Sequence, residues 1–551
     1  MQRAIVAGLF AALTILMTWP VGIFPAGIRM GGGADPSLYV WTIGWGTHAL
    51  THAPWAIFNA NIFYPYQYTL AYSENLIGSA LLAIPIMWVT GDALIATNLV
   101  SVLSVFLCAV GGYYLGRTVG LSLVAAFLCG LIFAFVPPLF ARLGQLHLIA
   151  VQWVPFGLAR LYRYLRDGQA RDLRWTIALL SLQALASGHG AALMILGGAI
   201  LVGFDLARTR TLDLARRVRD VGIPGVLAIL PAALAFIPYW LARRDVPLER
   251  VHDDVGVTWN SYISSPTHLH TAILERLPDW EWLRVYPDAH LFPGFAVIVL
   301  AALAFRSAHA GFSPRDHPRA VFLTMVIVTW WMTIGPPWSV WGYVYWLPGL
   351  NFIRVPSRFT MLGVLALAVL AGYGFDRMVH AWSQRGRLVA AAALSAVLLV
   401  EFAVMPVDVR PFDSQIAPID HWLDSQPKPF AIAEVPVSAS RDNSRRAEVA
   451  TMYMLHSLAH HQPTVFGYSG AEPATYRPLY DTLIGFPSDD SIRALTETGV
   501  TYVVAHLEYF TEEDRGEFLE RAATFGDRLQ VVHRDGLGIV YRIGESVIGK
   551  R

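Results

Sequence analysis

Charged residues are scarce in this chain of 551 residues: they make up 15% of it, while hydrophobic residues make up 55%. Soluble globular proteins carry about 25% charged residues. The shortage therefore excludes a soluble protein of this size and predicts a chain that crosses a membrane several times. The net charge is +1, so no excess of positive charge indicates a nucleic-acid partner.

Cysteine and lysine are also nearly absent. The two cysteines, Cys108 and Cys129, lie inside apolar runs, which argues against a disulfide framework or a cysteine metal site. Lysine occurs only as Lys428 and Lys550, so almost all positive charge is arginine, which favours a GC-rich bacterial source. The arginines cluster in short loops between apolar runs, where cytoplasmic orientation signals are found.

Long apolar runs predict eleven membrane spans. They cover residues 4–24, 99–115, 121–135, 148–165, 175–186, 191–202, 223–241, 295–305, 321–334, 359–374 and 388–404. The arginines at 160–174 mark a cytoplasmic loop. A crossing at 76–89 would place that loop outside, so this short run is predicted to be interfacial or re-entrant. The first span is too long for a signal-peptide core, and we expect it to be retained with the N-terminus inside.

The composition changes after Pro406. From Asp408 onward no apolar run is long enough to cross, and we expect an extracytoplasmic α/β domain at 408–551. Buried strands are predicted at 430–437 and 500–506, a hairpin about Asp535-Gly536, and helices at 441–457, 474–484 and 510–523. The predicted fold class is a mainly α polytopic membrane protein, residues 1–407, followed by this α/β domain.

The predicted first outer loop, residues 25–98, opens with MGGGADPSLYVWTIGW and its lone carboxylate, Asp35. We expect the glycines at 31–33 to be flexible and a helix to start near Pro36 and run through Trp41, Trp45 and His48. One interpretation makes Asp35 the N-cap of an interfacial helix with its tryptophans at headgroup depth. The other makes Asp35 a general base facing a polar cleft. The aromatic residues at 63–68 are expected to be interfacial.

Further polar positions fall on the same outer side by the parity of the spans, and their co-location predicts a shared cleft. They are Glu74, Gln145, His147, His189, the acidic and aromatic loop 245–290 with Asp253 and Asp254, and Arg354 with Arg358. Each has a simpler interpretation: the histidines as capping or packing residues, the arginines as snorkelling to lipid phosphates, and the loop as a solvated surface.

Several segments carry a resemblance to a known superfamily. DPSLYVWTIGW, IFYPYQYTLAYSENLIGSALLAIPI, RLGQLHLIAVQWVPF and FIRVPSRF resemble C-type (GT-C) glycosyltransferases, near the aminoarabinose and protein mannosyl transferases, and the likeness covers residues 1–407. It implies a polyprenyl-phosphate sugar as donor, a lipid, glycan or protein as acceptor, and Asp35 as the residue that activates the acceptor. Many members place a second carboxylate after the third span, where this chain has Gln145 and His147. We therefore expect no metal and no other cofactor.

The implied mechanism is a single displacement with inversion at the outer face of the bacterial cytoplasmic membrane. Asp35 would take the acceptor proton, and Arg354, with Arg358 as second choice, would hold the donor phosphate. Two other classes stay open. A lipid or polysaccharide transporter or flippase usually shows inverted repeats and ionisable residues at mid-membrane. A non-catalytic envelope-assembly protein would use the C-terminal domain for binding and would not need Asp35.

Overall fold

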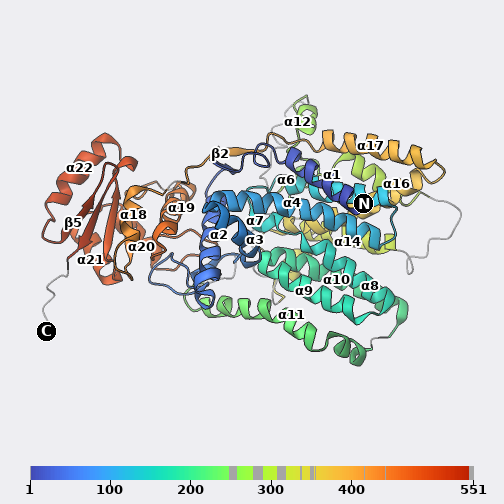
Figure 1. Cartoon of the computed structure of the whole chain (residues 1–551), viewed down its shortest axis with the longest axis horizontal. Coiled ribbons are helices and arrows are strands. Elements are labelled where there is room, and N and C mark those ends of the chain that lie inside the picture. Colours follow the sequence, from blue (N-terminus) through green and yellow to red (C-terminus); the bar gives the residue numbers. More distant parts are fainter. Residues whose placement is uncertain are drawn as a thin grey trace.

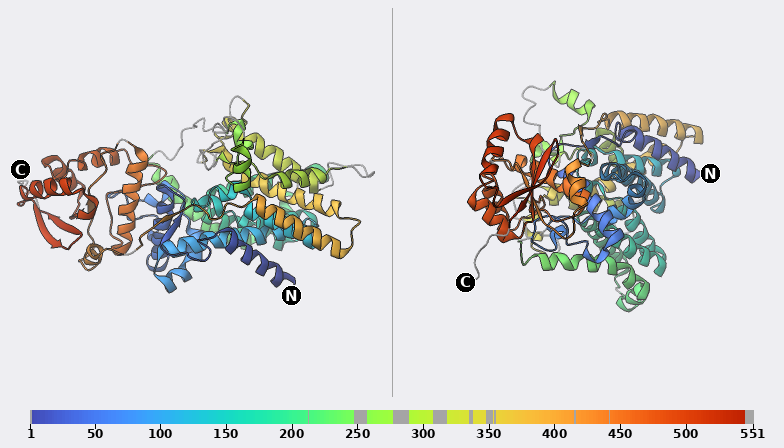
Figure 2. Two further views of the ribbon diagram at one scale, coloured as in Figure 1. Left: turned by 90° about the horizontal axis from the view of Figure 1, so that it is seen from above. Right: turned by 60° about the vertical axis from the view of Figure 1, so that its left-hand side comes forward.

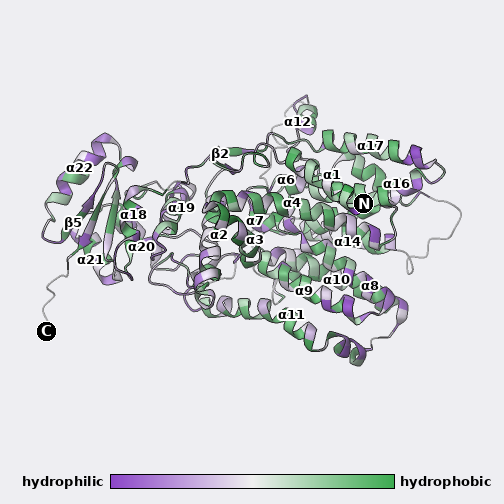
Figure 3. Ribbon diagram, viewed as in Figure 1, coloured by the Kyte–Doolittle hydropathy of each residue, from purple (hydrophilic) through white to green (hydrophobic). Residues whose placement is uncertain are grey.

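The computed structural model describes residues 2–211, 213–246, 257–276, 289–306, 318–334, 338–347, 353, 355–414, 416–440 and 442–544. Long helices form an elongated body, and a C-terminal α/β region (residues 418–544) lies at one end of the long axis (Figures 1 and 2). Apolar residues follow the helices of the body, whereas hydrophilic residues gather in the C-terminal region and at the far ends of the helices (Figure 3). This distribution is that of a membrane protein with polar groups at both ends of its helices.

The body is made up of helices, in the following chain order. They are α1 Gln2–Met17, α2 Asp35–His52, α3 Ile77–Thr90, α4 Ala93–Thr118, α5 Leu123–Phe135, α6 Pro137–Phe140, α7 Leu146–Ile149, α8 Trp153–Asp167, α9 Ala170–Ala186, α10 Gly188–Thr209, α11 Leu214–Ala242, α12 His268–Leu274, α13 Phe295–Leu303, α14 Pro318–Thr333, α15 Trp341–Val344, α16 Thr360–Met378 and α17 Gln384–Glu401. Short 3₁₀ turns at Pro54–Ala56 (η1), Thr69–Tyr72 (η2), Trp259–Tyr262 (η3) and Pro356–Phe359 (η6) join them.

Within the described residues, five helical stretches are long and apolar enough to cross a membrane: Ala93–Thr118, Leu123–Phe140, Gly188–Thr209, Leu214–Ala242 and Pro356–Met378. Three shorter apolar helices, α1, α3 and α14, accompany them. A count of eleven spans stays a prediction. The predicted break at SGHG is confirmed, because α9 ends at Ala186 and the Ser187 hydroxyl accepts a hydrogen bond from the Gly190 N–H at the start of α10.

The span predicted at 148–165 is wrong in its first turn. The chain forms the short α7 and then restarts as α8 at Trp153. The side-chain amide of Gln183, on α9, bridges the break: its Nε2 donates to the Ala150 carbonyl at 2.7 Å, and its Oε1 accepts from the Trp153 N–H at 3.2 Å. A glutamine buried two helices away thus replaces the missing helical hydrogen bonds.

The C-terminal region is a four-stranded sheet in the order β3-β4-β6-β5, with helices around it. Its elements are α18 Pro418–Asp424, β3 Ile432–Val435, α19 Asn443–His460, α20 Tyr476–Leu483, α21 Asp489–Thr498, β4 Tyr502–His506, η7 Leu507–Tyr509, α22 Glu512–Ala523, β5 Leu529–Arg534 and β6 Gly538–Ile543. Strands β3 and β4 are parallel and fully buried, as their apolar runs predict. The predicted hairpin is confirmed, since Asp535 Oδ1 accepts from the N–H groups of Leu537 and Gly538 between β5 and β6.

The C-terminal region packs directly on the first loop of the body. Strand β1 (Ile28–Met30) pairs antiparallel with β2 (Val409–Pro411), and α2 packs against α19. Across the second contact, the rings of His48 and His461 stack with centroids 3.5 Å apart. Residues separated by most of the chain therefore meet at one end of the body (Figure 1).

This packing overturns the interfacial assignment of Trp41, Trp45 and Phe63, whereas that of the half-buried tyrosines at 64–68 stays a prediction. Trp41 and Trp45 are buried, and the Trp45 indole N–H donates to the Ile57 carbonyl at 2.9 Å. Phe63 is also buried and meets Tyr476 edge to face, while the Tyr66 hydroxyl lies 2.6 Å from that of Thr475. The partner of these rings is protein rather than the lipid headgroup layer, because the C-terminal region covers the loop that carries them.

Candidate active site

Asp35 is the first residue of α2, and its carboxylate reaches away from the helix end. The N-cap is Ala34, and no side chain caps this terminus, so the interpretation of Asp35 as an N-cap is wrong. Its Oδ1 accepts a hydrogen bond of 2.7 Å from the Tyr468 hydroxyl, and its Oδ2 accepts one of 3.3 Å from Gln145 Nε2. The side chain is half-buried at the junction of the body and the C-terminal region.

Of the three glycines before Asp35, Gly31 serves close packing, whereas the predicted flexibility of the exposed Gly32 and Gly33 stays a prediction. Gly31 has φ +77° and packs against Gly144, and a Cβ on Gly144 would lie 2.9 Å from the Met30 carbonyl oxygen and 3.2 Å from the Gly31 Cα. The Gly31 N–H also donates to the Asp408 carbonyl. Because the two segments meet at Gly31 and Gly144, which have no side chains, the loop of Gly144 approaches closely enough for Gln145 to reach the Asp35 carboxylate.

Tyr39 connects Asp35 to two buried histidines. It lies one helical turn after Asp35 on α2, and its hydroxyl is 2.6 Å from His147 Nδ1. The His147 ring meets the His189 ring edge to face at 5.3 Å. Burial first, and then the neighbouring Asp35 carboxylate, raises the pKa of Tyr39 well above its ordinary value. The Tyr39 phenol is therefore neutral at physiological pH.

The second half of the site is a chain of three side chains. His189 Nδ1 lies 2.6 Å from Glu74 Oε1, and Arg358 Nη1 lies 2.7 Å from His189 Nε2. Since a guanidinium can only donate, Nε2 is the acceptor, and the ring proton is on Nδ1, where it points at Glu74. Burial alone would raise the pKa of Glu74, but the hydrogen bonds from His189 and from the Gly188 and His189 N–H groups bring it below its ordinary value. The chain thus runs from a buried carboxylate through a neutral imidazole to a half-buried cation.

Together these residues form the Asp35 cluster. Its members are Asp35, Tyr39, Glu74, Gln145, His147, His189, Arg358 and Tyr468. The structure brings together six residues that the sequence predicted for the shared site, namely Asp35, Glu74, Gln145, His147, His189 and Arg358, and adds Tyr39 and Tyr468. It does not bring the described part of the loop 245–290 to this site. The helical spacing from Asp35 could have pointed to Tyr39. No local signal could have pointed to Tyr468, which is 433 residues from Asp35.

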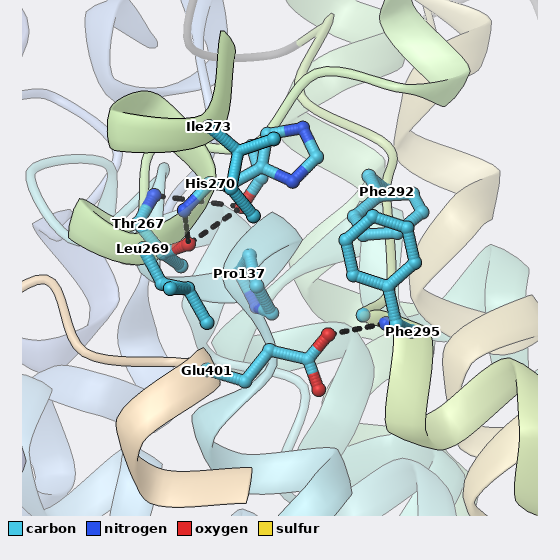
Figure 4. Close-up of a pocket in the computed structure, with 10 residues that line it drawn as sticks. Pro137, Thr267, Leu269, His270, Ile273, Phe292, Phe295 and Glu401 are labelled. Carbon is cyan, nitrogen blue, oxygen red and sulfur yellow. Dashed lines mark hydrogen bonds between the residues drawn. The ribbon is translucent and has the colours of Figure 1, made fainter. Parts of the chain in front are cut away.

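Arg354, Asp253 and Asp254 lie outside the described residues. The described part of the acidic and aromatic loop packs at another place, around a pocket lined by His270, Phe292, Phe295 and Glu401 (Figure 4). There the Glu401 carboxylate accepts hydrogen bonds from the Phe295 and Ala296 N–H groups and so caps the N-terminus of α13. The Glu401 carboxylate in this pocket therefore has a structural role as a helix cap, and no member of the Asp35 cluster lines the pocket.

The chemistry of the Asp35 cluster is that of a base beside an anion site. A half-buried carboxylate can take a proton, and the guanidinium of Arg358 can hold a phosphate oxygen. Among the described residues no group of three or more His, Cys, Asp or Glu side chains is arranged to hold a metal ion.

The fold is shared with a solved arabinofuranosyltransferase over almost the whole of this chain. No protein-family profile and no curated protein matches the sequence.

The solved structure of the arabinofuranosyltransferase AftD from Mycobacteria is similar with a TM-score of 0.61 and 14% sequence identity. The match covers 99% of this chain but 40% of AftD, so this chain spans less than half of that enzyme. A mutant form of AftD gives a TM-score of 0.58 at 15% identity, over 99% of this chain and 41% of that one. ArnT from Cupriavidus metallidurans bound to undecaprenyl phosphate aligns over 98% and 99% of the two chains at 14% identity, with a TM-score of 0.44 that is too low to support an argument.

Proposed function

We propose that this protein is a membrane glycosyltransferase that moves a sugar from a polyprenyl-phosphate donor to a hydroxyl of a lipid, glycan or protein acceptor. The observation that carries the proposal is the Asp35 cluster on a GT-C fold. Its half-buried Asp35 carboxylate accepts hydrogen bonds from Tyr468 and Gln145, and its half-buried Arg358 guanidinium donates to His189, whose ring contacts that of His147. A transporter would have no evident use for a base held by two donors beside a cation.

The reaction is a single displacement. The acceptor O–H bond breaks and its proton passes to the Asp35 carboxylate, while the acceptor oxygen forms a bond to the anomeric carbon. The bond from that carbon to the phosphate oxygen breaks, and the phosphate leaves with the electron pair. Arg358 stabilises the charge that develops on the leaving phosphate. With no enzyme nucleophile in the path, the anomeric configuration inverts, and the step needs neither a metal nor an organic cofactor.

Asp35→Asn is the direct test. Since Asp35 is not the cap of α2, the substitution exchanges one carboxylate oxygen for an amide and keeps the side-chain volume. We expect purified, monodisperse Asp35→Asn protein to lose on the order of 10²- to 10⁴-fold in transfer of a labelled sugar from polyprenyl phosphate, the usual effect of removing a general base. Wild-type turnover in this variant would refute Asp35 as the base.

The roles proposed for Arg358 and Arg354 can be distinguished by measuring how tightly each variant binds the polyprenyl-phosphate sugar donor. Arg358→Lys keeps a positive charge but loses the planar fork of donors, so we expect donor binding to weaken markedly. The same substitution at Arg354 tests whether a second guanidinium shares the phosphate. Unchanged donor affinity in both variants would assign the phosphate to another group.

The orientation follows from the arginine-rich loops. The C-terminal ends of α8 and α10, with their arginines, lie toward the end of the body opposite the C-terminal region (Figure 1). We propose that they face the cytoplasm, that the N-terminus is cytoplasmic, and that the Asp35 cluster and the C-terminal region lie outside the bacterial inner membrane. Reporter fusions after Arg174 and after Asp408 should report opposite sides, and agreement between them would refute this topology.

A further inference from the structure

We propose that the C-terminal α/β region completes the active site, with Tyr468 as a positioning residue that holds the Asp35 carboxylate in the orientation from which it takes the acceptor proton. The inference rests on the proposed function and assigns a part in it to a region that otherwise lies outside the helical body. Its first observation is the hydrogen bond of 2.7 Å from the Tyr468 hydroxyl to Asp35 Oδ1. With Oδ1 held by Tyr468 and Oδ2 by the longer bond of 3.3 Å from Gln145, the two donors fix the orientation of the carboxylate, and each oxygen keeps a second lone pair for an acceptor.

Backbone hydrogen bonds between the first loop and the segment just before Tyr468 fix the position of this tyrosine. The Phe63 N–H donates to the Phe466 carbonyl, and the Tyr64 N–H donates to the Thr464 carbonyl, each at 3.0 Å. The Tyr468 N–H in turn lies 3.1 Å from the sulfur of Met454. Two backbone segments therefore run side by side, one from the first loop and one from the C-terminal region, and they end at the tyrosine.

Gly467 lets this approach happen. A Cβ on Gly467 would lie 2.5 Å from the ring of Phe63, which is itself buried. Only a residue without a side chain fits between that ring and the backbone, so the aromatic residue of the loop sets the position of Tyr468. The aromatic residues of the first loop thus serve as a docking surface for the residue that orients the base.

The hydrogen bond also has a chemical effect. A donor to a carboxylate stabilises its charged form, and a fixed carboxylate loses less freedom when the acceptor binds. Removing the Tyr468 hydroxyl should therefore reduce turnover without removing the base.

Tyr468→Phe tests the inference, with Tyr66→Phe as the matched control. Both remove one phenolic hydroxyl from the same interface, but the Tyr66 hydroxyl meets Thr475 and does not reach Asp35. For Tyr468→Phe we expect kcat to fall on the order of tenfold at unchanged KM for the donor. Tyr66→Phe should leave kcat and KM unchanged, at comparable thermal stability.

The outcomes separate this inference from the proposed function. An inactive Asp35→Asn protein together with a Tyr468→Phe protein of wild-type kcat would overturn the role of Tyr468 alone. Equal losses in Tyr468→Phe and Tyr66→Phe would also overturn it, because they would reflect docking in general. An active Asp35→Asn protein would overturn the proposed function. In the Asp35→Asn background, Tyr468→Phe should have no further effect on turnover.

Discussion

Glu74→Gln tests the part of the Asp35 cluster that positions the Arg358 guanidinium, through His189. The Glu74 carboxylate accepts three hydrogen bonds, from the Gly188 N–H at 2.9 Å, the His189 N–H at 3.3 Å and the His189 ring at 2.6 Å. Both oxygens are used. A glutamine brings one oxygen and one NH₂ group, so at least one of these donors would face another donor.

The size of the effect follows from that mismatch. An unsatisfied buried donor costs about 1–3 kcal/mol. The ring of His189 is the partner held by the shortest of the three bonds, and it in turn accepts from Arg358. We expect the loss to appear partly as lower stability and partly as a misplaced guanidinium, with KM for the polyprenyl-phosphate sugar raised on the order of tenfold, or about 1.4 kcal/mol.

The assay compares KM and thermal unfolding in two carboxylate-to-amide variants. Asp172 is a suitable control because its carboxylate is buried more deeply than that of Glu74 and is bonded to Arg160 at 2.8 Å, but it lies on α9 near the arginine-rich end of the body. Asp172→Asn should lower the unfolding temperature without changing KM. If Glu74→Gln lowers stability alone and leaves KM at the wild-type value, Glu74 does not act through Arg358, and the reasoning fails.

Two further predictions concern the junction between the body and the C-terminal region. Gly467→Ala should lower stability by about 1–3 kcal/mol through overpacking against Phe63, and Phe63→Leu should partly restore it in the double variant; a fully stable single variant in thermal unfolding would contradict the close packing. Burial, then the nearby His52, lowers the pKa of His48 to about 4, and burial, then His48, lowers that of His461 to about 3. Both lie below the ordinary 6.5, so the unfolded chain binds protons first and stability should fall as pH drops from about 6.5 to about 4. Asparagine tolerates the left-handed backbone at position 461, so His461→Asn should fold and should reduce the loss of stability on acidification by on the order of 1 kcal/mol. If unfolding scans of the wild-type and His461→Asn proteins show the same acid sensitivity, the stacked His48–His461 pair is excluded as its source.

The sequence predicted what depends on neighbouring residues. Pro36 after Asp35 marked the start of α2, Asp535-Gly536 marked the β5–β6 turn, and the β-branched run at 500–506 marked a buried strand. These signals act within a few residues and do not depend on the rest of the fold.

What the sequence could not predict depends on contacts between distant parts of the chain. Trp41 and Phe63 are of the residue types expected at the lipid headgroup layer. They are buried in the protein because the C-terminal region covers them, and no local pattern in the sequence predicts that covering. Likewise, the Gln183 amide that joins α7 to α8, and the Tyr468 hydroxyl on Asp35, meet partners that no local pattern connects to them.

The pairing of β1 with β2, and of Asp35 with Tyr468, sets an order of events during biosynthesis. The ribosome makes Tyr468 433 residues after Asp35, which takes about 20 to 90 s at 5–20 residues per second. During that interval the carboxylate has emerged without the hydroxyl that orients it, and β1 has no partner strand. The membrane helices can be inserted before the Tyr468 hydroxyl is made, so we expect a nascent or truncated chain that ends before the C-terminal region to enter the membrane with an incomplete Asp35 cluster.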